Sequence, residues 1–240
     1  MNQKFSPLKI VKKIYIKLIH ILCDAKRGPL IPQLEKNLNA LTFRGITLQS
    51  NDELSIISSN CFAGRIMQDL HLKYNSPTLG LYFMYPDYIE FLNNLEFYLK
   101  KAKLEFKEHS KYPIGDERRA SWSHWYPIAL LADKVEIHFL HYFSEKEAAE
   151  KWYKRAARVN LDRLFIIGMD QNLCTEEDIM QFDKLPYENK LFFSTHNLPV
   201  ESNEYMPEFE GNDCVGDPYR KAHLFYRHLI SYLKNKNNNY

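Results

Sequence analysis

Glycine is scarce in this 240-residue chain, with 8 residues against 16 tyrosines and 15 phenylalanines. The few glycines form no G-x-G-x-x-G, G-x-x-x-x-G-K or G-x-S-x-G motif. Their absence argues against a glycine-rich nucleotide loop and against the nucleophile elbow of an α/β-hydrolase. Hydrophobic residues make up 45% of the chain, which is enough for a sizeable core in one large domain.

Motifs for metals and reactive dithiols are also missing. The four cysteines are far apart and form no C-x-x-C pair, so neither a zinc ribbon nor a thioredoxin-like dithiol is predicted. No Asp-x-Asp pair occurs, which argues against a transferase that holds Mg²⁺ or Mn²⁺ through two such carboxylates. We therefore predict no metal and no cofactor.

Signals for export or membrane insertion are equally absent. No secretory signal is visible, and no run of about 18 apolar residues is long enough to span a bilayer. We expect a cytoplasmic protein with reduced cysteines.

The net charge of +2 is unevenly distributed along the chain. Residues 1–27 contain six lysines, one arginine and one aspartate, a net charge of +6, which leaves −4 for the remainder. A mildly acidic main body is a poor match to a nucleic-acid binder, so no nucleic-acid partner is predicted.

Residues 8–22 have the periodicity of an amphipathic helix. Apolar residues fall on one arc and lysines on the other, although Ile16 interrupts the lysine arc. One interpretation is a helix that packs on the domain with a solvated lysine face. The other is a helix that lies on the anionic inner face of the cytoplasmic membrane.

The rest of the chain alternates short apolar strands with amphipathic helices. This alternation predicts an α/β fold: a three-layer, mostly parallel, Rossmann-like sheet with helices on both faces. We predict an N-terminal amphipathic extension over residues 1–32 and a single α/β domain over residues 33–240. Strands are predicted over residues 54–58, 79–84, 104–106, 125–131, 135–142, 164–168 and 190–194, loops over 108–123 and 197–216, and a C-terminal helix from residue 217.

Small polar residues follow the first of these strands, where a helix is predicted to begin near Ala63. In open α/β sheets, ligands bind beyond the carboxyl ends of strands, and a helix N-terminus attracts anions. Ser59, Asn60 and Gly64 are therefore candidate substrate-binding residues. The positive end of the helix dipole would also lower the pKa of Cys61 and make its thiolate a nucleophile. The alternative is a capped turn with a buried structural cysteine.

Two histidines lie in the Glu136–Tyr142 stretch. On a strand, alternation sends His138 and His141 to opposite faces, which argues against one metal held by both. Glu136 and His138 share a face and are suited to form an acid–base pair. Because His141 is nearer the carboxyl end of the strand, it is the better catalytic candidate.

A second histidine-containing loop follows the last predicted strand. Thr195 is a candidate for substrate binding and His196 for catalysis, because both lie where a strand ends.

A basic stripe lies on the helix predicted over residues 144–159. Lys151, Arg155 and Arg158 are spaced along one face, and arginines in such a stripe can hold a phosphate with two hydrogen bonds each. The alternative is a solvated face whose cations pair with carboxylates such as Glu147.

Five stretches of the chain carry a resemblance to known proteins: residues 57–64, 72–78, 137–148, 152–160 and 185–187. Together they resemble a bacterial family, the family of domain of unknown function 1919, which is often labelled exopolysaccharide biosynthesis protein. The resemblance covers roughly residues 40–195. It implies an α/β fold and a role in capsule, exopolysaccharide or lipopolysaccharide assembly, without an agreed reaction or established catalytic residues. Ser76, in the second of these stretches, joins the candidate binding residues.

Three functions follow as hypotheses. The first is a transferase of surface-polysaccharide synthesis that moves a glycosyl group from a nucleotide sugar or other activated donor to a glycan acceptor, with His141 or His196 as general base. The second is an acyltransferase that uses Cys61. The third is a non-catalytic assembly partner held at the membrane by residues 8–22.

Overall fold

A four-stranded parallel sheet lies at the centre of the structure, a computed structural model that describes residues 7–43, 46–47 and 54–238. The strand order is β3-β7-β8-β9, and every neighbouring pair is parallel. The strands are β3 (Ser55–Ser58), β7 (Leu164–Met169), β8 (Lys190–Ser194) and β9 (Asn203–Tyr205).

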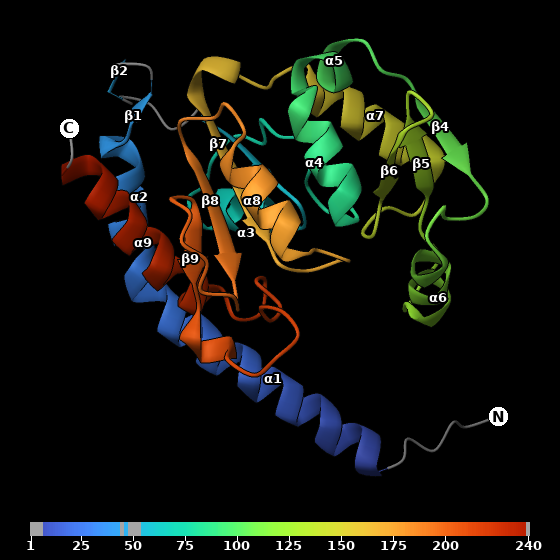
Figure 1. Cartoon of the computed structure of the whole chain (residues 1–240). Coiled ribbons are helices and arrows are strands. Elements are labelled where there is room, and N and C mark those ends of the chain that lie inside the picture. Colours follow the sequence, from blue (N-terminus) through green and yellow to red (C-terminus); the bar gives the residue numbers. More distant parts are fainter. Residues whose placement is uncertain (1–6, 44–45, 48–53, 239–240) are drawn as a thin grey trace.

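Helices cover both faces of this sheet, because β3 and β7 are apolar on both sides. Ile56 packs in one core cluster and Ile57 in the other, as alternation along a strand requires. Figure 1 shows α8 in front of β7 and β8, with α2 and α9 beyond the opposite face. The first cluster contains residues of α2 (Ile31–Ala40), α3 (Phe62–Asp69) and α9 (Ala222–Asn238), and the second contains residues of α4 (Tyr85–Asn93), α5 (Leu95–Lys100), α7 (Glu145–Ala156) and α8 (Glu176–Asp183).

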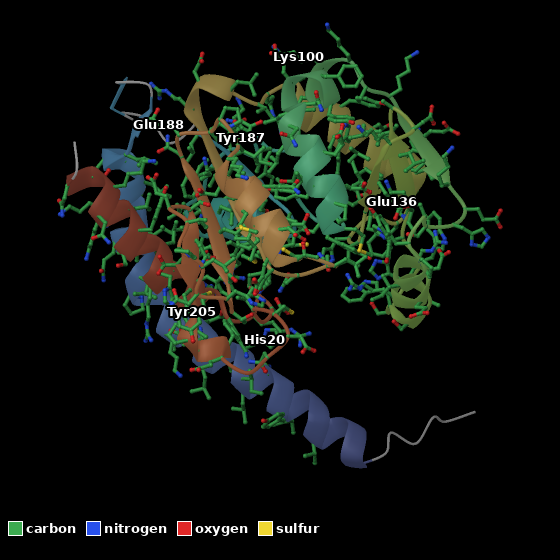
Figure 2. All side chains as sticks on the ribbon, viewed as in Figure 1. His20, Lys100, Glu136, Tyr187, Glu188 and Tyr205 are labelled. Atoms are coloured by element: carbon green, nitrogen blue, oxygen red, sulfur yellow. The ribbon has the colours of Figure 1, made fainter. Side chains whose placement is uncertain are left out.

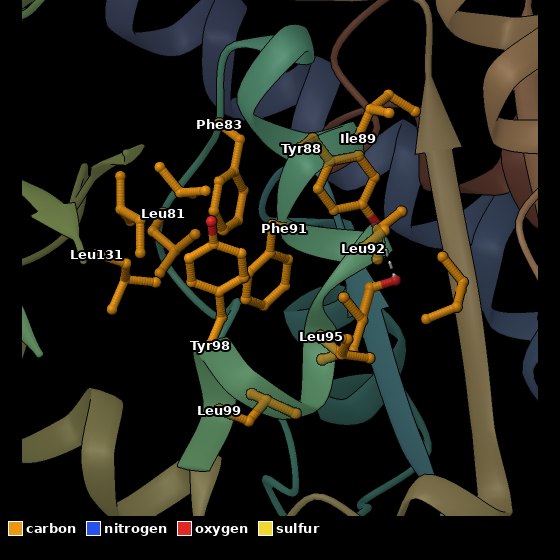
Figure 3. Packing of buried hydrophobic residues seen from close by; sticks show 14 of the residues in the cluster. Leu81, Phe83, Tyr88, Ile89, Phe91, Leu92, Leu95, Tyr98, Leu99 and Leu131 are labelled. Atoms are coloured by element: carbon orange, nitrogen blue, oxygen red, sulfur yellow. Dashed lines mark hydrogen bonds between the residues drawn. The ribbon is translucent and has the colours of Figure 1, made fainter. Parts of the chain in front are cut away.

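Aromatic rings dominate the second core cluster. Figure 3 shows Phe83, Phe91 and Tyr98 packed together beside the leucines of α4 and α5. The buried Tyr88 hydroxyl donates a hydrogen bond to the Ile167 carbonyl oxygen at 2.9 Å, which ties α4 to β7. The predicted three-layer α/β architecture is confirmed.

A separate antiparallel sheet stands beside the parallel one. It consists of β4 (Leu104–Lys107), β5 (Ile128–Leu131) and β6 (Val135–His138) in the order β4-β5-β6. Ala132 and Asp133 both have positive φ, which suits the tight turn that joins β5 to β6. A two-residue pair, β1 (Thr42–Phe43) and β2 (Ile46–Thr47), follows α2.

Residues 79–84 connect the two sheets without forming the predicted strand. Tyr82 exchanges backbone hydrogen bonds of 3.0 Å with His138, and the Phe83 amide donates to the Ser59 carbonyl oxygen at 3.0 Å. The chain is therefore extended here, as its apolar sequence suggests. It meets the end of β6 in an isolated bridge at His138 and the residue after β3 through one hydrogen bond. The prediction of a regular strand is wrong because neither neighbour runs alongside it far enough to form a ladder.

Two predicted loops contain regular structure. Residues 108–123 include α6 (Pro113–Ser121), which has proline in its first turn and Arg118 and Arg119 in its last. Residues 197–216 include β9 and the short helix η4 (Pro207–Phe209), and α9 begins at Ala222 rather than at residue 217. Two further one-turn helices are η1 (Gly28–Leu30) and η3 (Leu161–Arg163).

The predicted N-terminal helix is present as α1 (Pro7–Arg27), and residues 1–6 of the predicted extension lie outside the described residues. Figure 1 shows α1 running from beside α9 outward along the lower end of the molecule. Its last turn is tied to the body, since Arg27 Nε lies 2.9 Å from Asp69 Oδ2. Among the helices that the structure describes, none is both long and apolar enough to cross a membrane.

A histidine clamp joins α9 to β9 and η4 and gives a pH-dependent prediction. His228 Nδ1 lies 2.6 Å from Glu204 Oε1, and its Nε2 lies 3.0 Å from Glu208 Oε2. The hydrogen bond to Glu204 raises the pKa of His228, with a further contribution from Glu208, against the opposing effect of burial. The folded state therefore favours protonated His228, and this stabilisation is lost as pH rises from about 6.5 through the raised pKa.

We expect His228→Gln to cost roughly 1 kcal/mol of unfolding free energy at pH 6 and clearly less at pH 9. Urea unfolding of both proteins at the two pH values measures this difference. Equal costs at pH 6 and pH 9 would contradict the ionic character of the clamp.

Candidate functional site

A cavity of about 1040 Å³ opens beyond the carboxyl ends of β3 and β7. In Figure 1 the arrow of β8 points toward this lower end of the sheet, where α1 and α6 also lie. Figure 2 labels His20, the α1 residue in the cavity wall. The other walls come from the turn after β3, the segment after β7, the 214–220 loop, α6, α7 and the stretch after β6.

Amide side chains join three parts of the chain at the base of this cavity. Asn60 Nδ2 donates to Gln171 Oε1 at 2.9 Å, and Gln171 Nε2 donates to the Val215 carbonyl oxygen at 2.8 Å. Asp170 accepts from the Val215 amide at 2.8 Å and from the Thr195 hydroxyl at 2.7 Å. The turn after β3 and the 214–220 loop are therefore held together through β7.

The N-terminus of α3 does not offer the predicted backbone anion site. The Phe62 amide donates to Asn60 Oδ1 at 3.0 Å, and the Ala63 amide donates to Ser58 Oγ at 3.0 Å. These side chains cap the two donors that an anion would need. Asn60 and Gly64 line the cavity, so their part in the site is to shape its wall.

Cys61 lines the cavity but lacks the predicted activation. Burial raises its pKa to about 12, and the nearby Asp217 carboxylate adds to the effect. Its Sγ lies 3.6 Å from the Leu81 carbonyl oxygen, as expected of a thiol donor. The expectation that the helix dipole lowers this pKa is wrong, because the thiol is shielded from water and faces a negative charge.

Two arginines in the cavity, Arg118 and Arg155, donate hydrogen bonds only to neutral groups. Arg155 Nη1 donates to the Tyr142 hydroxyl at 2.6 Å, and Arg118 Nη1 donates to Asn172 Oδ1 at 2.6 Å. No carboxylate of the described residues lies within ion-pair distance of either guanidinium. Two uncompensated cations in one concave site are suited to bind an anionic ligand such as a phosphate.

The remaining cations of the basic stripe have other partners. Lys151 lines the cavity and pairs with Glu147 at 2.6 Å, as the alternative interpretation of the stripe expects. Arg158 donates to the Tyr74 carbonyl oxygen and lies at a separate, smaller depression. Lys151 and Arg155 thus carry the predicted stripe into the cavity, and of these two Arg155 has no carboxylate of the described residues within ion-pair distance.

His141 lines the same cavity in a form suited to accept a proton. Burial lowers its pKa, and neighbouring His124 lowers it further, against an opposing effect of Asp217. The imidazole is therefore neutral at physiological pH. Its backbone amide donates to the Gly80 carbonyl oxygen at 2.9 Å, and its ring meets that of Trp122 edge to face, with centroids 6.3 Å apart.

Gly80 controls the position of His141. It has φ of +75°, and an added Cβ would lie 3.4 Å from His141 Cβ and 3.3 Å from the Tyr142 ring. We expect Gly80→Ala to cost roughly 1–2 kcal/mol of stability and more than Gly211→Ala, because the left-handed conformation is unfavourable for alanine and because the added Cβ presses on the Tyr142 ring. Thermal or urea unfolding measures this cost. Gly211→Ala is the matched control for φ alone, since Gly211 has φ of +79° and open space around it. An equal loss of stability in both variants would exclude a role for the contacts at His141 and Tyr142.

Besides Arg158, four predicted residues lie outside the cavity wall. His196, the other candidate general base, lies with its Nδ1 3.1 Å from Glu176 Oε1 and does not line the cavity with His141. Thr195 contacts the site only through Asp170. Ser59 is buried between Ile167 and Phe83, and Ser76 is buried against Thr78. Neither serine lines the cavity.

Glu136 and His138 form the predicted pair, with Glu136 Oε1 and His138 Nε2 2.7 Å apart and both side chains buried. Glu136 accepts a hydrogen bond from His138 Nε2, and His138 Nδ1 lies 3.1 Å from the Tyr82 hydroxyl oxygen. Tyr82 lines the cavity, which places the pair directly behind its wall.

Sequence patterns missed several cavity residues. Arg118 and Trp122 lie in or beside α6, in a region interpreted as an exposed loop, although Pro113 could have indicated a helix start. Asp217 and Tyr219 carry no pattern that links them to the site. Among the residues described by the structure, no group of three or more histidine, cysteine, aspartate or glutamate side chains is arranged to hold a metal ion.

Comparison with known proteins agrees with the suspected family. A Haemophilus influenzae protein described as "Uncharacterized protein" is 39% identical over 169 residues, which are 70% of this chain and 75% of that protein. The family described as "Domain of unknown function (DUF1919)" matches residues 35–236. The match includes the C-terminal segment beyond residue 195, and with it the 214–220 loop of the cavity. The chain belongs to the DUF1919 family.

Proposed function

We propose that this protein is a transferase of cell-surface polysaccharide synthesis that moves a glycosyl group from a phosphate-activated sugar donor. The observation that carries the proposal is the cavity with Arg118 and Arg155, two guanidinium groups without carboxylate partners among the described residues. A volume of about 1040 Å³ lies at the upper end for small-molecule sites. The arginines hold the donor phosphates, and the pathway is the one that the resemblance noted in the sequence implies.

An aromatic ring in the cavity suits the sugar. Arg118 lies over the Tyr82 ring at 5.1 Å, and Arg155 lies over the Tyr74 ring at 5.7 Å. Both contacts fix a guanidinium beside an apolar surface. The Tyr82 ring is only 4% exposed and stacks on His138, so it offers no surface to a sugar. Tyr74 is 41% exposed, and a sugar that packs on its ring has its linked phosphate close to Arg155.

His141 is the general base of the proposed reaction. It removes the proton from an acceptor hydroxyl while the hydroxyl oxygen forms a bond to the anomeric carbon of the donor. The bond from that carbon to the phosphate oxygen breaks, and the phosphate leaves with the electron pair. Arg118 and Arg155 stabilise the negative charge of the leaving group.

A thermal-shift screen tests the proposal. Nucleotide sugars are compared with free nucleosides and free sugars. A ligand that binds only the native state raises its stability, by about 2.7 kcal/mol at 100 times the dissociation constant. We expect stabilisation by a nucleotide sugar and none by a sugar without phosphate. The absence of a thermal shift with every phosphate-bearing donor would contradict the proposal.

Cys61→Ser distinguishes glycosyl from acyl transfer. Because burial and Asp217 raise the pKa of Cys61 to about 12, the thiol is not expected to act as a nucleophile. We expect this variant to keep its affinity for the nucleotide sugar and its transfer rate within about threefold, since serine is nearly isosteric. A loss of activity with acyl-CoA donors, at unchanged stability, would favour the acyltransferase hypothesis.

We also propose that α1 attaches the protein to the inner face of an anionic membrane. Seven apolar side chains of α1 are between 37% and 63% exposed, and residues 1–27 carry a net charge of +6. An amphipathic helix of this kind lies in the headgroup region, and each nearby lysine contributes about 1 kcal/mol with anionic lipids. The seven residues, which we call the apolar row, are Val11, Ile14, Tyr15, Leu18, Ile19, Ile21 and Leu22.

Co-sedimentation with lipid vesicles tests the attachment. We expect binding to phosphatidylglycerol vesicles that weakens with salt and is lost in the paired variant Leu18→Asp/Leu22→Asp. Binding that is unchanged in this variant would contradict the proposal. Membrane binding without any nucleotide-sugar binding would favour the non-catalytic assembly partner.

A further inference from the structure

Helix α1 lines the cavity with one side and carries the apolar row on the other. His20 is part of the cavity wall. Leu18 and Leu22 are two residues away from His20 in either direction, so each points roughly 200° around the helix from it. The apolar row therefore faces away from the cavity that His20 helps to form.

Ion pairs fix α1 in this orientation. Asp69 Oδ2 forms an ion pair with Arg27, whose Nε lies 2.9 Å away, and it accepts hydrogen bonds from Arg65 Nε at 3.1 Å and from the Tyr226 hydroxyl at 2.7 Å. Asp24, on the preceding turn of α1, lies 3.6 Å from Arg65. Since the Asp69 side chain is only 7% exposed, the contacts of Asp69 are shielded from water and hold the end of α1 on α3 and α9.

Aromatic residues with an apolar body and a polar tip lie around the cavity opening. Tyr74, Trp122 and Tyr219 line the cavity, and each is about 40% exposed. Trp125 and Phe143, close by in sequence to Trp122 and Tyr142, are more exposed still. Tyrosine and tryptophan are favoured at the boundary between lipid and water.

A membrane under the apolar row brings the cavity close to lipid headgroups. A helix with its side chains is about 10–12 Å across, and His20 lies on the side of α1 opposite the row. The cavity wall at His20 is therefore about one helix diameter from the lipid surface. A ligand anchored in the bilayer by a hydrocarbon chain can reach the cavity with its headgroup.

We infer that the acceptor is a lipid-linked sugar phosphate, whose phosphate-bearing head enters the cavity while its hydrocarbon chain stays in the bilayer. The inference rests on the proposed function, because it assigns the acceptor of the same site. The reaction is the transfer described above, with the attacking hydroxyl on the lipid-linked sugar. The uncompensated charges of Arg118 and Arg155 serve its phosphate as well as the donor.

The test uses the full chain and vesicles of matched surface charge. One set contains phosphatidylcholine with a long-chain polyprenyl diphosphate, and the other contains phosphatidylcholine with phosphatidylglycerol. We expect the polyprenyl diphosphate vesicles to bind about tenfold more tightly, which corresponds to about 1.4 kcal/mol. The gain disappears in Arg155→Gln and in Leu18→Asp/Leu22→Asp, and it persists in the exposed control variant Arg227→Gln.

Each outcome separates this inference from the proposed function. Normal stabilisation by a nucleotide sugar without tighter binding to the polyprenyl vesicles overturns the lipid-linked acceptor and leaves the transferase in place. Tighter binding that survives Arg155→Gln overturns the cavity as its site. A dimer in light scattering that Leu18→Asp/Leu22→Asp dissociates shows the apolar row to be covered by a second copy, which also overturns it. If neither the nucleotide sugar stabilises the protein nor the polyprenyl diphosphate vesicles bind more tightly, both proposals are overturned.

Discussion

Replacing Arg155 by glutamine lowers the affinity for a nucleotide sugar by about 10- to 100-fold, because a hydrogen bond between charged groups is worth about 1.5–3 kcal/mol. Arg118→Gln has an effect of the same size, and the double variant loses more than either. Neither guanidinium pairs with a carboxylate among the described residues, so neither substitution leaves a buried anion unpaired. Isothermal titration calorimetry measures the affinities.

Arg227→Gln is the matched control for the arginine variants, since Arg227 is an exposed arginine of α9 that does not line the cavity. It should leave the affinity unchanged. Equal affinities in the wild type, Arg118→Gln and Arg155→Gln would contradict the assignment of the phosphate site.

Replacing Glu136 by alanine lowers the unfolding free energy by about 3–5 kcal/mol, the usual cost of removing one partner of a buried ionic network. The Glu136 carboxylate accepts hydrogen bonds from His138 Nε2 at 2.7 Å, from the Lys111 amide at 2.7 Å and from the Ser110 hydroxyl. Its removal leaves the buried His138 Nε2, the half-buried Ser110 hydroxyl and the Lys111 amide without this acceptor. Urea unfolding followed by circular dichroism measures the loss.

Glu150→Ala is a matched control on α7, where Glu150 is 66% exposed and lies 4.0 Å from Lys146. It should change stability by less than about 0.5 kcal/mol. Burial alone would raise the pKa of Glu136, but hydrogen bonds from His138, Ser110 and Lys111 hold it below the ordinary value. The carboxylate therefore stabilises the fold above about pH 4.5, and this contribution is lost as pH falls through the lowered pKa. A loss below 1 kcal/mol in Glu136→Ala would contradict the network.

The sheet could be predicted from sequence because its strands are short apolar runs followed by turn residues. β8 occupies the predicted residues 190–194, and β7 extends one residue beyond the predicted 164–168. The 79–84 segment has the same apolar character, yet it meets Ser59 and His138 by single backbone contacts. Composition cannot distinguish a bridging segment from a strand, since pairing depends on neighbours that are distant in sequence.

The candidate site was less predictable because it depends on which side chains meet. Asn60, Cys61, Gly64, His141 and Arg155 line the cavity, in agreement with their predicted positions at strand ends and on α7. Arg118 lies on α6, within a polar stretch that was predicted to be a loop. His196 pairs with Glu176 and does not line the cavity. The predicted lowering of the pKa of Cys61 was wrong, because burial and Asp217 outweigh the helix dipole.

Side-chain NMR of the arginine Nε–H groups tests the central claim most directly. The protein is titrated with the nucleotide sugar that gives the largest thermal shift. We predict that the signals of Arg118 and Arg155 move with a common dissociation constant and that the signal of Arg227 stays in place. Shifts confined to arginines outside the cavity, with Arg118 and Arg155 unmoved at saturation, would contradict a phosphate-binding site in this cavity.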